Sequence, residues 1–323
     1  MHFRLVNHHI SDPQVVKTGV PQGSTLGLLL FLVYINDLPQ VTDLKVRLFA
    51  DDACLSLEEK NPLALQEKVN SELFKVHQWL INNKLFINYT KSNYLIFNKN
   101  LSGHTFNIKL GPKIIDRANT VKYLGVTLDD KLNWKSHLEN LSNKLAKTCY
   151  IFYKLRNYVN ISTLKMIYYS LVYSKLQYCI TSWGRACDYL ISKIFIKQKS
   201  IIKIMCKRNR RSSTNPLFHE LELLKLSDIY KFQISKQMYN SRNTSLVGQN
   251  NLISLHNVHN HQTRLAVHSN FFIPRTRTKL GQISFNFNGP KIWKEIPQSL
   301  KSLPIKLFKL NLKKFFVDNY SNS

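Results

Sequence analysis

A strongly apolar stretch lies near the N-terminus of the chain. An uninterrupted apolar run extends from Leu28 to Ile35, and Pro39 stands shortly after it. Ser24 is a suitable N-cap, so the pattern predicts a helix from Ser24 to about Asp37. Because this helix is apolar on nearly all sides, we expect it to be buried.

Extended and amphipathic patterns come next. Residues 46–50 and 53–57 predict two strands joined at a pair of aspartates. Asn61-Pro62 then opens an amphipathic helix. Its apolar face consists of Val69, Leu73, Val76 and Leu80. Residues 91–97 and 106–128 predict further β structure, so this part of the chain favours a small α+β domain.

Helical periodicity dominates after Asp129. One helical face continues from Trp134 to Asn157, and Ser162 is expected to cap a second helix. Further helices are predicted at residues 189–205 and, in the tail, at 307–316, while the Asn-rich residues 241–260 favour a linker. The predicted domains are residues 1–128, a helical region at 129–240, and a linker with a basic C-terminal region at 241–323.

Charge is the first clue to function. The 323 residues carry a formal net charge of +27, with 44% hydrophobic and 11% aromatic residues. Lys and Arg interleave with aromatic residues, which favours phosphate contacts combined with base stacking. A basic surface that serves only solubility is the alternative. The cluster Lys207–Arg211 has the same two interpretations, a phosphate-contacting edge or a solvated helix end.

The cysteines and apolar runs restrict the setting of the protein. Five cysteines without a Cys-x-x-Cys pair indicate reduced thiols, so we expect an intracellular protein, with nucleus and cytoplasm both open. The N-terminus does not resemble a signal peptide. The run from Leu28 to Ile35 is far shorter than the roughly 20 residues that span a bilayer, so no membrane insertion is expected.

The paired Asp51 and Asp52 are the strongest chemical signal. Placing two like charges side by side costs on the order of a few kcal/mol of free energy unless a cation neutralises them. A hairpin that displays two aspartates is suited to holding divalent metals over a phosphate. A structural turn is the alternative interpretation for an isolated Asp-Asp pair. His256, His259 and His261 also cluster, but their Asn-rich, cysteine-free setting argues against zinc.

Four strings in order resemble a known family. Gly19–Ser24 is similar to motif B of the reverse transcriptases of non-LTR retrotransposons, in particular jockey-type elements, and Phe49–Asp52 resembles motif C. Leu85–Lys91 is similar to motif D, and Val121–Val126 resembles motif E, the primer grip. The likeness extends over nearly the whole chain. It implies a fold made of a partial palm, with an antiparallel sheet and helices, followed by a helical thumb.

The resemblance implies an RNA-directed DNA polymerase that uses two-metal nucleotidyl transfer. Asp51 and Asp52 would hold Mg²⁺ or Mn²⁺, and Lys91 would stabilise the leaving pyrophosphate. The implied nucleotide- and template-binding residues are Pro21, Gln22, Gly23, Ser24 and Phe49, and the implied primer grip is Tyr123, Leu124 and Gly125. The implied partners are an RNA template, an RNA–DNA duplex and deoxynucleoside triphosphates. Taken singly, these residues have structural interpretations as a tight turn, a surface lysine and core positions.

The chain departs from the family pattern upstream of motif B. Motif A supplies a further metal-binding aspartate there, yet only 18 residues precede Gly19, and Asp12 is the single acid among them. Asp12 is a poor substitute because it lies in a Ser-Asp-Pro loop. We therefore expect a truncated copy that is inactive by itself. A non-catalytic nucleic-acid-binding remnant and a relic without a role remain the alternatives, and the sequence does not indicate an oligomeric state.

Overall fold

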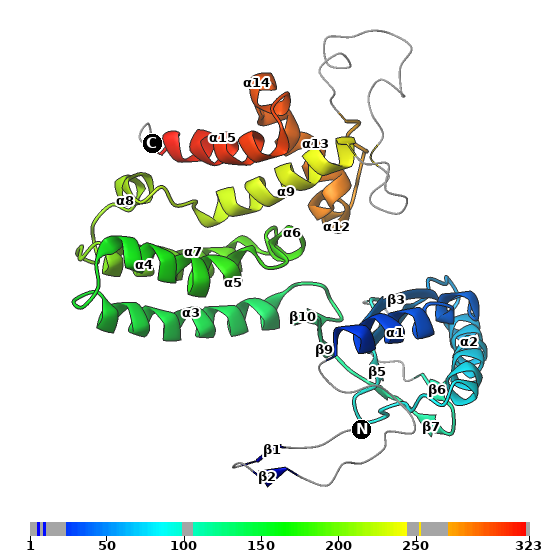
Figure 1. The fold of residues 1–323 in the computed structure, drawn as a ribbon. Helices are drawn as coiled ribbons and strands as arrows, with labels where there is room; N and C mark the ends of the chain where they lie inside the picture. The colour runs from blue at the N-terminus through cyan, green and yellow to red at the C-terminus, as the bar shows by residue number, and fades with distance from the viewer. Residues whose placement is uncertain are drawn as a thin grey trace. The chain divides into compact units, whose positions relative to one another are not determined.

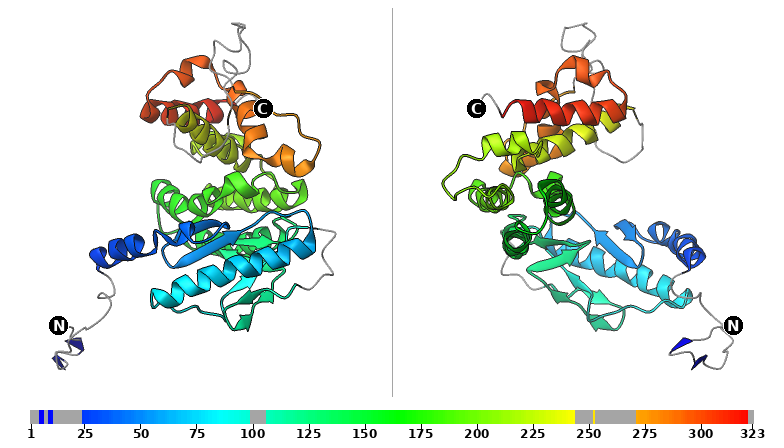
Figure 2. Two further views of the ribbon diagram at one scale, coloured as in Figure 1. Left: turned by 90° about the vertical axis from the view of Figure 1, so that its right-hand side faces the viewer. Right: turned by 60° about the vertical axis from the view of Figure 1, so that its left-hand side comes forward.

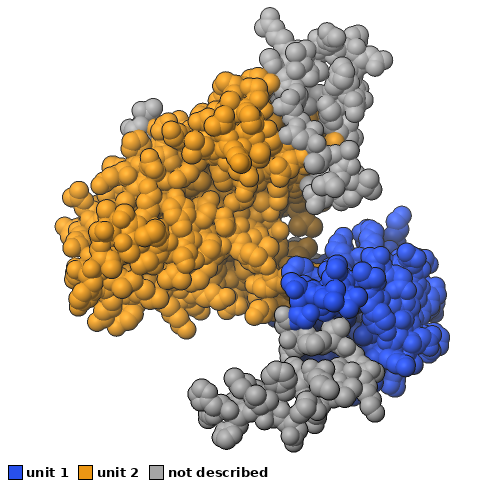
Figure 3. All heavy atoms as spheres, in the orientation of Figure 1, with its two compact units in different colours: residues 1–121 blue, residues 122–323 orange. Residues whose placement is uncertain are grey.

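The computed structural model describes residues 24–98, 106–243, 252 and 271–320, together with the backbone of two short strands at 5–6 and 9–10. The chain forms two compact units, Met1–Val121 and Lys122–Ser323, which Figure 3 colours separately. Each unit has its own core and is described by itself. The mixture of helices and small sheets confirms an α+β fold.

Unit 1 combines short paired strands with two long helices (Figure 1). Two-stranded sheets pair β1 with β2, β3 with β4, β5 with β8, and β6 with β7; the β5–β8 pair is parallel and the others are antiparallel. Its elements are β1 (Leu5–Val6), β2 (His9–Ile10), α1 (Thr25–Ile35), the 3₁₀ helix η1 (Leu38–Gln40), β3 (Lys45–Phe49), β4 (Asp52–Ser56), α2 (Pro62–Asn82), β5 (Asn93–Tyr94), β6 (Lys109–Leu110), β7 (Lys113–Ile114) and β8 (Asp116–Arg117).

Helix α2 organises the core of unit 1. Asn61 caps it by accepting a hydrogen bond from the Leu63 amide at 3.0 Å, and Pro62 occupies its first turn. Leu73 and Val76 are buried on the predicted face. Leu73 packs with residues from β6 and the segment before it, whereas Val76 and Trp79 pack against the end of α1. One apolar face therefore joins both halves of the unit.

The prediction that α1 is buried was wrong. Ser24 caps the helix as expected, with its Oγ accepting from the Gly27 amide at 3.3 Å. However, only Gly27 and Ile35 are buried along it, and Leu28 is 56% exposed. A helix with apolar side chains on every face needs neighbours on every face. The described residues of unit 1 cover only its C-terminal end, where Ile35 joins the Trp79 cluster.

Unit 2 is almost entirely helical and lies in layers (Figures 1 and 2). Helix α3 packs along α7, and α9 in turn contacts α13 and α15. After β9 (Thr120–Tyr123), which crosses the unit boundary, the elements are β10 (Val126–Asp129), α3 (Lys135–Leu155), α4 (Ile161–Tyr168), the π-helix η3 (Tyr169–Tyr173), α5 (Ser174–Gln177), α6 (Ile180–Trp183), α7 (Asp188–Met205), α8 (Asn215–Glu220), α9 (Leu226–Asn243), α12 (Lys279–Ile283), α13 (Phe285–Glu295), α14 (Gln298–Lys301) and α15 (Ile305–Asp318).

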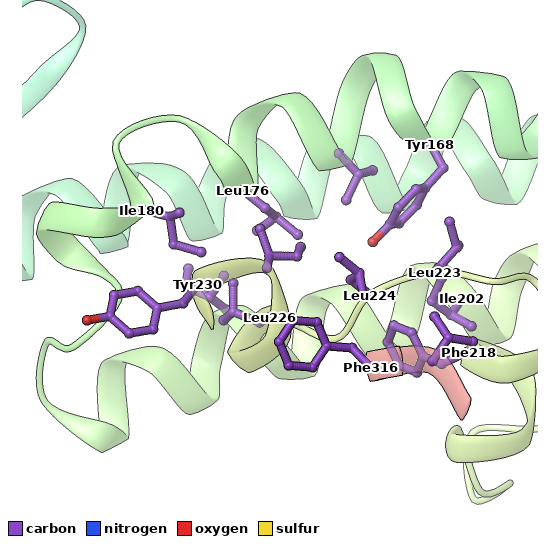
Figure 4. Close-up of a cluster of buried hydrophobic side chains, with 14 of the residues drawn as sticks. Tyr168, Leu176, Ile180, Ile202, Phe218, Leu223, Leu224, Leu226, Tyr230 and Phe316 are labelled. Carbon is purple, nitrogen blue, oxygen red and sulfur yellow. The ribbon is translucent and has the colours of Figure 1, made fainter. Parts of the chain in front are cut away.

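The core of unit 2 is large and apolar. Figure 4 shows side chains such as Tyr168, Phe218 and Phe316 converging from different helices. One buried polar residue crosses this core: the Gln198 amide nitrogen donates to Tyr168 Oη at 2.8 Å and to the Leu224 carbonyl at 2.9 Å. Its Oε1 accepts from the Leu226 amide at 2.9 Å, so both ends of the side chain are paired. A buried amide that is fully hydrogen-bonded fixes one arrangement of the surrounding helices.

The predicted helices after Asp129 correspond to α3, α7 and α15, and the predicted face of α3 is buried at Leu138, Leu145 and Phe152. The cap of α4 was misplaced. Asn160, not Ser162, accepts from the Thr163 amide at 2.9 Å, because an Asx side chain reaches the N3 amide equally well.

The remaining predictions have mixed outcomes. Residues 91–97 contain only the two-residue strand β5. Helix α9 continues into the predicted linker as far as Asn243, and the histidine cluster at 256–261 lies outside the described residues. The five cysteines are free thiols, which confirms the prediction. Across the described ranges, every helix is too short or too polar to cross a bilayer.

Candidate active site

The paired aspartates lie at the tip of the β3–β4 hairpin. The strands are antiparallel, with Leu48 opposite Ala53 and Phe49 opposite Asp52, so Ala50 and Asp51 form a two-residue turn. Ala50 has a φ of +51°, as tight hairpin turns require at one or both central positions. The register therefore places Asp51 in the turn itself and Asp52 at the first position of the returning strand.

Both carboxylates are exposed at this tip, and Phe49 beside them is 61% exposed. Within the described ranges, no cluster of three or more His, Cys, Asp or Glu side chains forms a ready metal site. Two oxygen ligands on neighbouring residues are thus available for a cation approaching from solvent. An exposed aromatic ring next to them offers an apolar surface on which a base or sugar can pack.

A buried carboxylate anchors the strand that leads to this tip. Glu72 on α2 accepts hydrogen bonds from Thr42 Oγ1 at 2.8 Å and the Asp43 amide at 2.7 Å, just before β3. Its other oxygen accepts from Lys75 Nζ at 2.6 Å. These bonds, that from Lys75 first, lower the pKa of Glu72 to about 2. The ionised group therefore ties the start of the hairpin to the helix.

Lys91 lies in an exposed turn of unit 1. Asn88 closes the turn by accepting from Thr90 Oγ1 at 2.7 Å and from the Lys91 amide at 3.3 Å. These bonds from the Asn88 side chain hold the backbone of the turn, and the Lys91 side chain is exposed to solvent. Among the described residues, no hydrogen bond or ion pair joins Lys91 to Asp51 or Asp52.

The residues predicted around motif B are only partly visible. Pro21, Gln22 and Gly23 lie outside the described residues. Ser24 is described, and its hydroxyl oxygen is engaged in capping α1. The structure therefore gives Ser24 a folding role, and its assignment to nucleotide or template binding stays a prediction.

The predicted primer-grip residues form a second tight hairpin, between β9 and β10. Tyr123 ends β9, and Leu124 and Gly125 form the turn with φ values of +44° and +78°. Two successive positive φ values characterise a type I′ turn, the connection that matches the twist of paired strands. Glycine is favoured at the second position because other residues are strained there.

Tyr178 holds this turn, and the sequence offered no motif that pointed to it. Its hydroxyl donates to the Leu124 carbonyl, and its ring lies against Gly125. Tyr178 reaches the turn because the helix breaks after Gln177: Tyr178 is extended, with ψ of 118°, and Cys179 is left-handed, with φ of +50°. Trp183 Nε1 fixes the break by donating to the Tyr178 carbonyl at 2.8 Å.

Two further residues attach the hairpin to α3. Asp129 at the end of β10 is buried and accepts from the backbone amides of Asn133 at 3.0 Å and Trp134 at 2.8 Å. His137 Nδ1 accepts from the Thr127 amide at 3.4 Å. Burial, with a smaller contribution from Lys144, lowers the pKa of His137, which favours the neutral ring that this acceptor role requires.

Comparisons with known proteins match the first part of the chain to one family. The family described as "Reverse transcriptase (RNA-dependent DNA polymerase)" matches residues 2–128, a segment that contains the aspartate hairpin and the Leu124–Gly125 turn. Residues 2–128 of this chain are thus similar to reverse transcriptases, and the relatives of the chain are polymerases from mobile elements. Members of this family generally use divalent metal ions, so an aspartate pair on a hairpin suits their chemistry.

Relatives in flies extend the likeness beyond this segment. The chain is 28% identical over 249 residues to the RNA-directed DNA polymerase from mobile element jockey of Drosophila melanogaster, covering 73% of this chain and 27% of the relative. It is 29% identical over 231 residues to the probable RNA-directed DNA polymerase from transposon X-element, covering 68% and 25%. The chain thus spans about a quarter of the length of the curated relatives it matches. No solved structure matches this chain significantly.

Proposed function

We propose that this chain supplies the metal-binding hairpin and the primer-grip hairpin of an RNA-directed DNA polymerase of a retrotransposon. The observation that carries the proposal is the display of Asp51 and Asp52 on an exposed hairpin tip, inside the segment that matches the reverse transcriptase family. Residues 1–128 would then belong to the palm and residues 129–240 to the thumb, with the basic C-terminal region after them.

The donor set fits a divalent cation such as Mg²⁺ or Mn²⁺, which prefers carboxylate oxygens. Asp51 and Asp52 would hold the ions, whose chemistry is to activate the primer 3′-hydroxyl and to neutralise charge on the triphosphate. Lys91 would donate to the leaving pyrophosphate from its exposed turn. Phe49 would pack against the nucleotide or template beside the carboxylates.

The second hairpin would bind the primer. Tyr123, Leu124 and Gly125 lie in or beside a type I′ turn whose conformation Tyr178 fixes. Because the Tyr178 side chain already holds this turn in one conformation, its backbone groups can contact a primer end without first becoming ordered. This lowers the entropic cost of binding. The proposed substrates are an RNA template, an RNA–DNA duplex and deoxynucleoside triphosphates.

A second candidate function is nucleic-acid binding without catalysis. The observation that favours it is the charge distribution: residues 140–187 contain seven Lys and Arg and no Asp or Glu, within a chain of net charge +27. A surface of this kind attracts phosphates whether or not a catalytic site is complete. Either function requires duplex binding that weakens steeply with salt.

Primer extension on an RNA template, measured beside duplex binding, distinguishes the two functions. We expect the 323-residue chain to bind a primer–template duplex, and any extension that it gives should require Asp51 and Asp52. Extension with Mg²⁺ or Mn²⁺ that disappears in Asp51→Ala would establish the polymerase, whereas duplex binding without extension would favour the second function. A folded chain that binds no duplex at low salt would contradict both candidate functions.

A further inference from the structure

The C-terminal part of α3 exposes an unusual set of aromatic rings. Tyr150 is 63% exposed, Tyr153 is 52% exposed, and Tyr158, just after the helix, is 85% exposed. The buried face of the same helix is already supplied by Leu138, Leu145 and Phe152, so the three tyrosines are not needed for its packing. Large exposed rings that gather in one place mark an interaction surface.

Basic side chains accompany these rings. Lys154 Nζ lies 5.6 Å from the centre of the Tyr150 ring, and the Arg156 guanidinium carbon lies 4.5 Å from the centre of the Tyr153 ring. Lys147 precedes Tyr150 by three positions, and Lys154 follows it by four, so all three share one helix face. The surface therefore alternates flat apolar rings with positive charges.

The surroundings strengthen this positive character. Residues 140–187, which include α3 from its middle onwards and the helices as far as α6, contain no acidic residue. Carboxylates within this segment therefore do not neutralise Lys147, Lys154 or Arg156. A polyanion is the partner whose charge is complementary to this surface.

The combination of rings and cations selects one kind of polyanion. A paired duplex presents phosphates, but its base faces are stacked on one another and closed to a side chain. An unpaired strand presents phosphates and open base faces together, and exposed aromatic residues in a basic groove are the usual way to bind it without sequence preference. Aliphatic side chains, which dominate protein interfaces of the helix-in-groove kind, contribute here mainly through Ile151, at 40% exposure.

We propose that the face formed by Lys147, Tyr150, Tyr153, Lys154, Arg156 and Tyr158 binds an unpaired nucleic-acid strand. Bases stack on the three tyrosine rings, and the cations contact the phosphates between them. The inference rests on the proposed function and deepens it. The proposed function requires binding of a primer–template duplex, whereas this face binds the single-stranded part of the template.

The test compares two ligands by fluorescence anisotropy: a 12-nucleotide single strand and a blunt duplex of the same sequence. The variant carries Tyr150→Ala, Tyr153→Ala and Tyr158→Ala in the full chain. Loss of three stacked bases weakens single-strand binding by at least about 100-fold, while duplex binding changes by less than about twofold. A matched variant with phenylalanine at the three positions keeps the rings and binds the single strand within about threefold of the wild-type affinity.

Two controls separate a local effect from unfolding. Phe74→Ala removes a ring that is 60% exposed on α2 in unit 1 and leaves both affinities unchanged. Circular dichroism and thermal unfolding of the alanine variant match those of the wild type, because the three side chains lie outside the core. Equal weakening for both ligands, or unchanged single-strand affinity while the wild type binds the duplex, overturns this inference and leaves the proposed function intact. A wild-type chain that binds neither ligand overturns both.

Discussion

Replacing Glu72 with glutamine should loosen the segment that leads to the aspartate hairpin. The carboxylate is 5% exposed and receives hydrogen bonds from Thr42, Asp43 and Lys75. Glutamine keeps the shape but removes the charge and turns one acceptor into a donor. The bonds to the chain just before β3 are therefore weakened or lost.

The size of the effect follows from the pKa of Glu72. A folded-state pKa of about 2, against an ordinary value of 4.5, corresponds to at most about 3.4 kcal/mol at about 1.36 kcal/mol per pH unit. Lys75 contributes most to this pKa, but its side chain is 49% exposed and its charge is screened. We therefore expect a loss of about 1–2 kcal/mol, in the range measured for hydrogen bonds to charged groups.

The stabilisation that Glu72 provides should depend on pH. A lowered carboxyl pKa stabilises the fold above the ordinary value of 4.5, and that stabilisation is lost as the pH falls from there toward about 2. The difference between wild type and Glu72→Gln should be complete at pH 7 and should fall to roughly half or less near pH 3.

Native-state hydrogen exchange of peptides covering residues 42–57 measures this difference. The variant should lower the opening free energy of these peptides at pH 7, whereas Glu67→Gln, on the same helix but exposed, should change it by less than about 0.3 kcal/mol. Equal protection in wild type and Glu72→Gln at pH 7, or a difference that does not shrink by pH 3, would refute the reasoning.

Three other variants test separate parts of the structure. Tyr178→Phe loses the hydrogen bond to the Leu124 carbonyl. The opening free energy measured by hydrogen exchange of the β9–β10 amides should therefore fall by about 0.5–1.5 kcal/mol, and an unchanged exchange rate would show that the bond is unimportant. Phe152→Ala should lower the unfolding free energy of unit 2 by about 3–5 kcal/mol in urea, against less than about 1 kcal/mol for the exposed Ile151→Ala, and similar losses would contradict the core assignment. Leu29→Lys should change thermal stability by less than about 0.5 kcal/mol, since Leu29 is 58% exposed, and a larger loss would mean that α1 is covered.

Much of the fold could be predicted from local periodicity. The β3–β4 hairpin, α2 and α3 were predictable because their buried positions repeat with the period of a strand or a helix, and the nearest neighbours along the chain decide which face is buried. The same reasoning failed for α1. The sequence shows that every face of this helix is apolar. Which faces are buried depends on which distant segments pack against them, and a local pattern does not contain this information.

Some residues of the candidate site could likewise be predicted from local sequence, and others could not. Asp51, Asp52 and the Leu124–Gly125 turn are visible in the sequence because each stands in a short motif. Tyr178 and Glu72 are not, because Tyr178 acts on a turn 54 positions away and Glu72 acts on a loop 30 positions away. The break that directs Tyr178 toward the turn contains neither glycine nor proline, so its usual sequence signal is missing as well.

Manganese binding to the aspartate hairpin tests the central claim most directly. Mn²⁺ titrations followed by electron paramagnetic resonance, with an RNA–DNA duplex bound, would compare the wild type with the double variant Asp51→Asn/Asp52→Asn. The control Glu59→Gln/Asp116→Asn removes the same charge from exposed positions of unit 1. We predict at least about tenfold weaker Mn²⁺ binding in the aspartate variant alone, because direct ligands matter at least as much as the groups that support them. Equal Mn²⁺ affinity in all three proteins would contradict the assignment of this hairpin as a metal site.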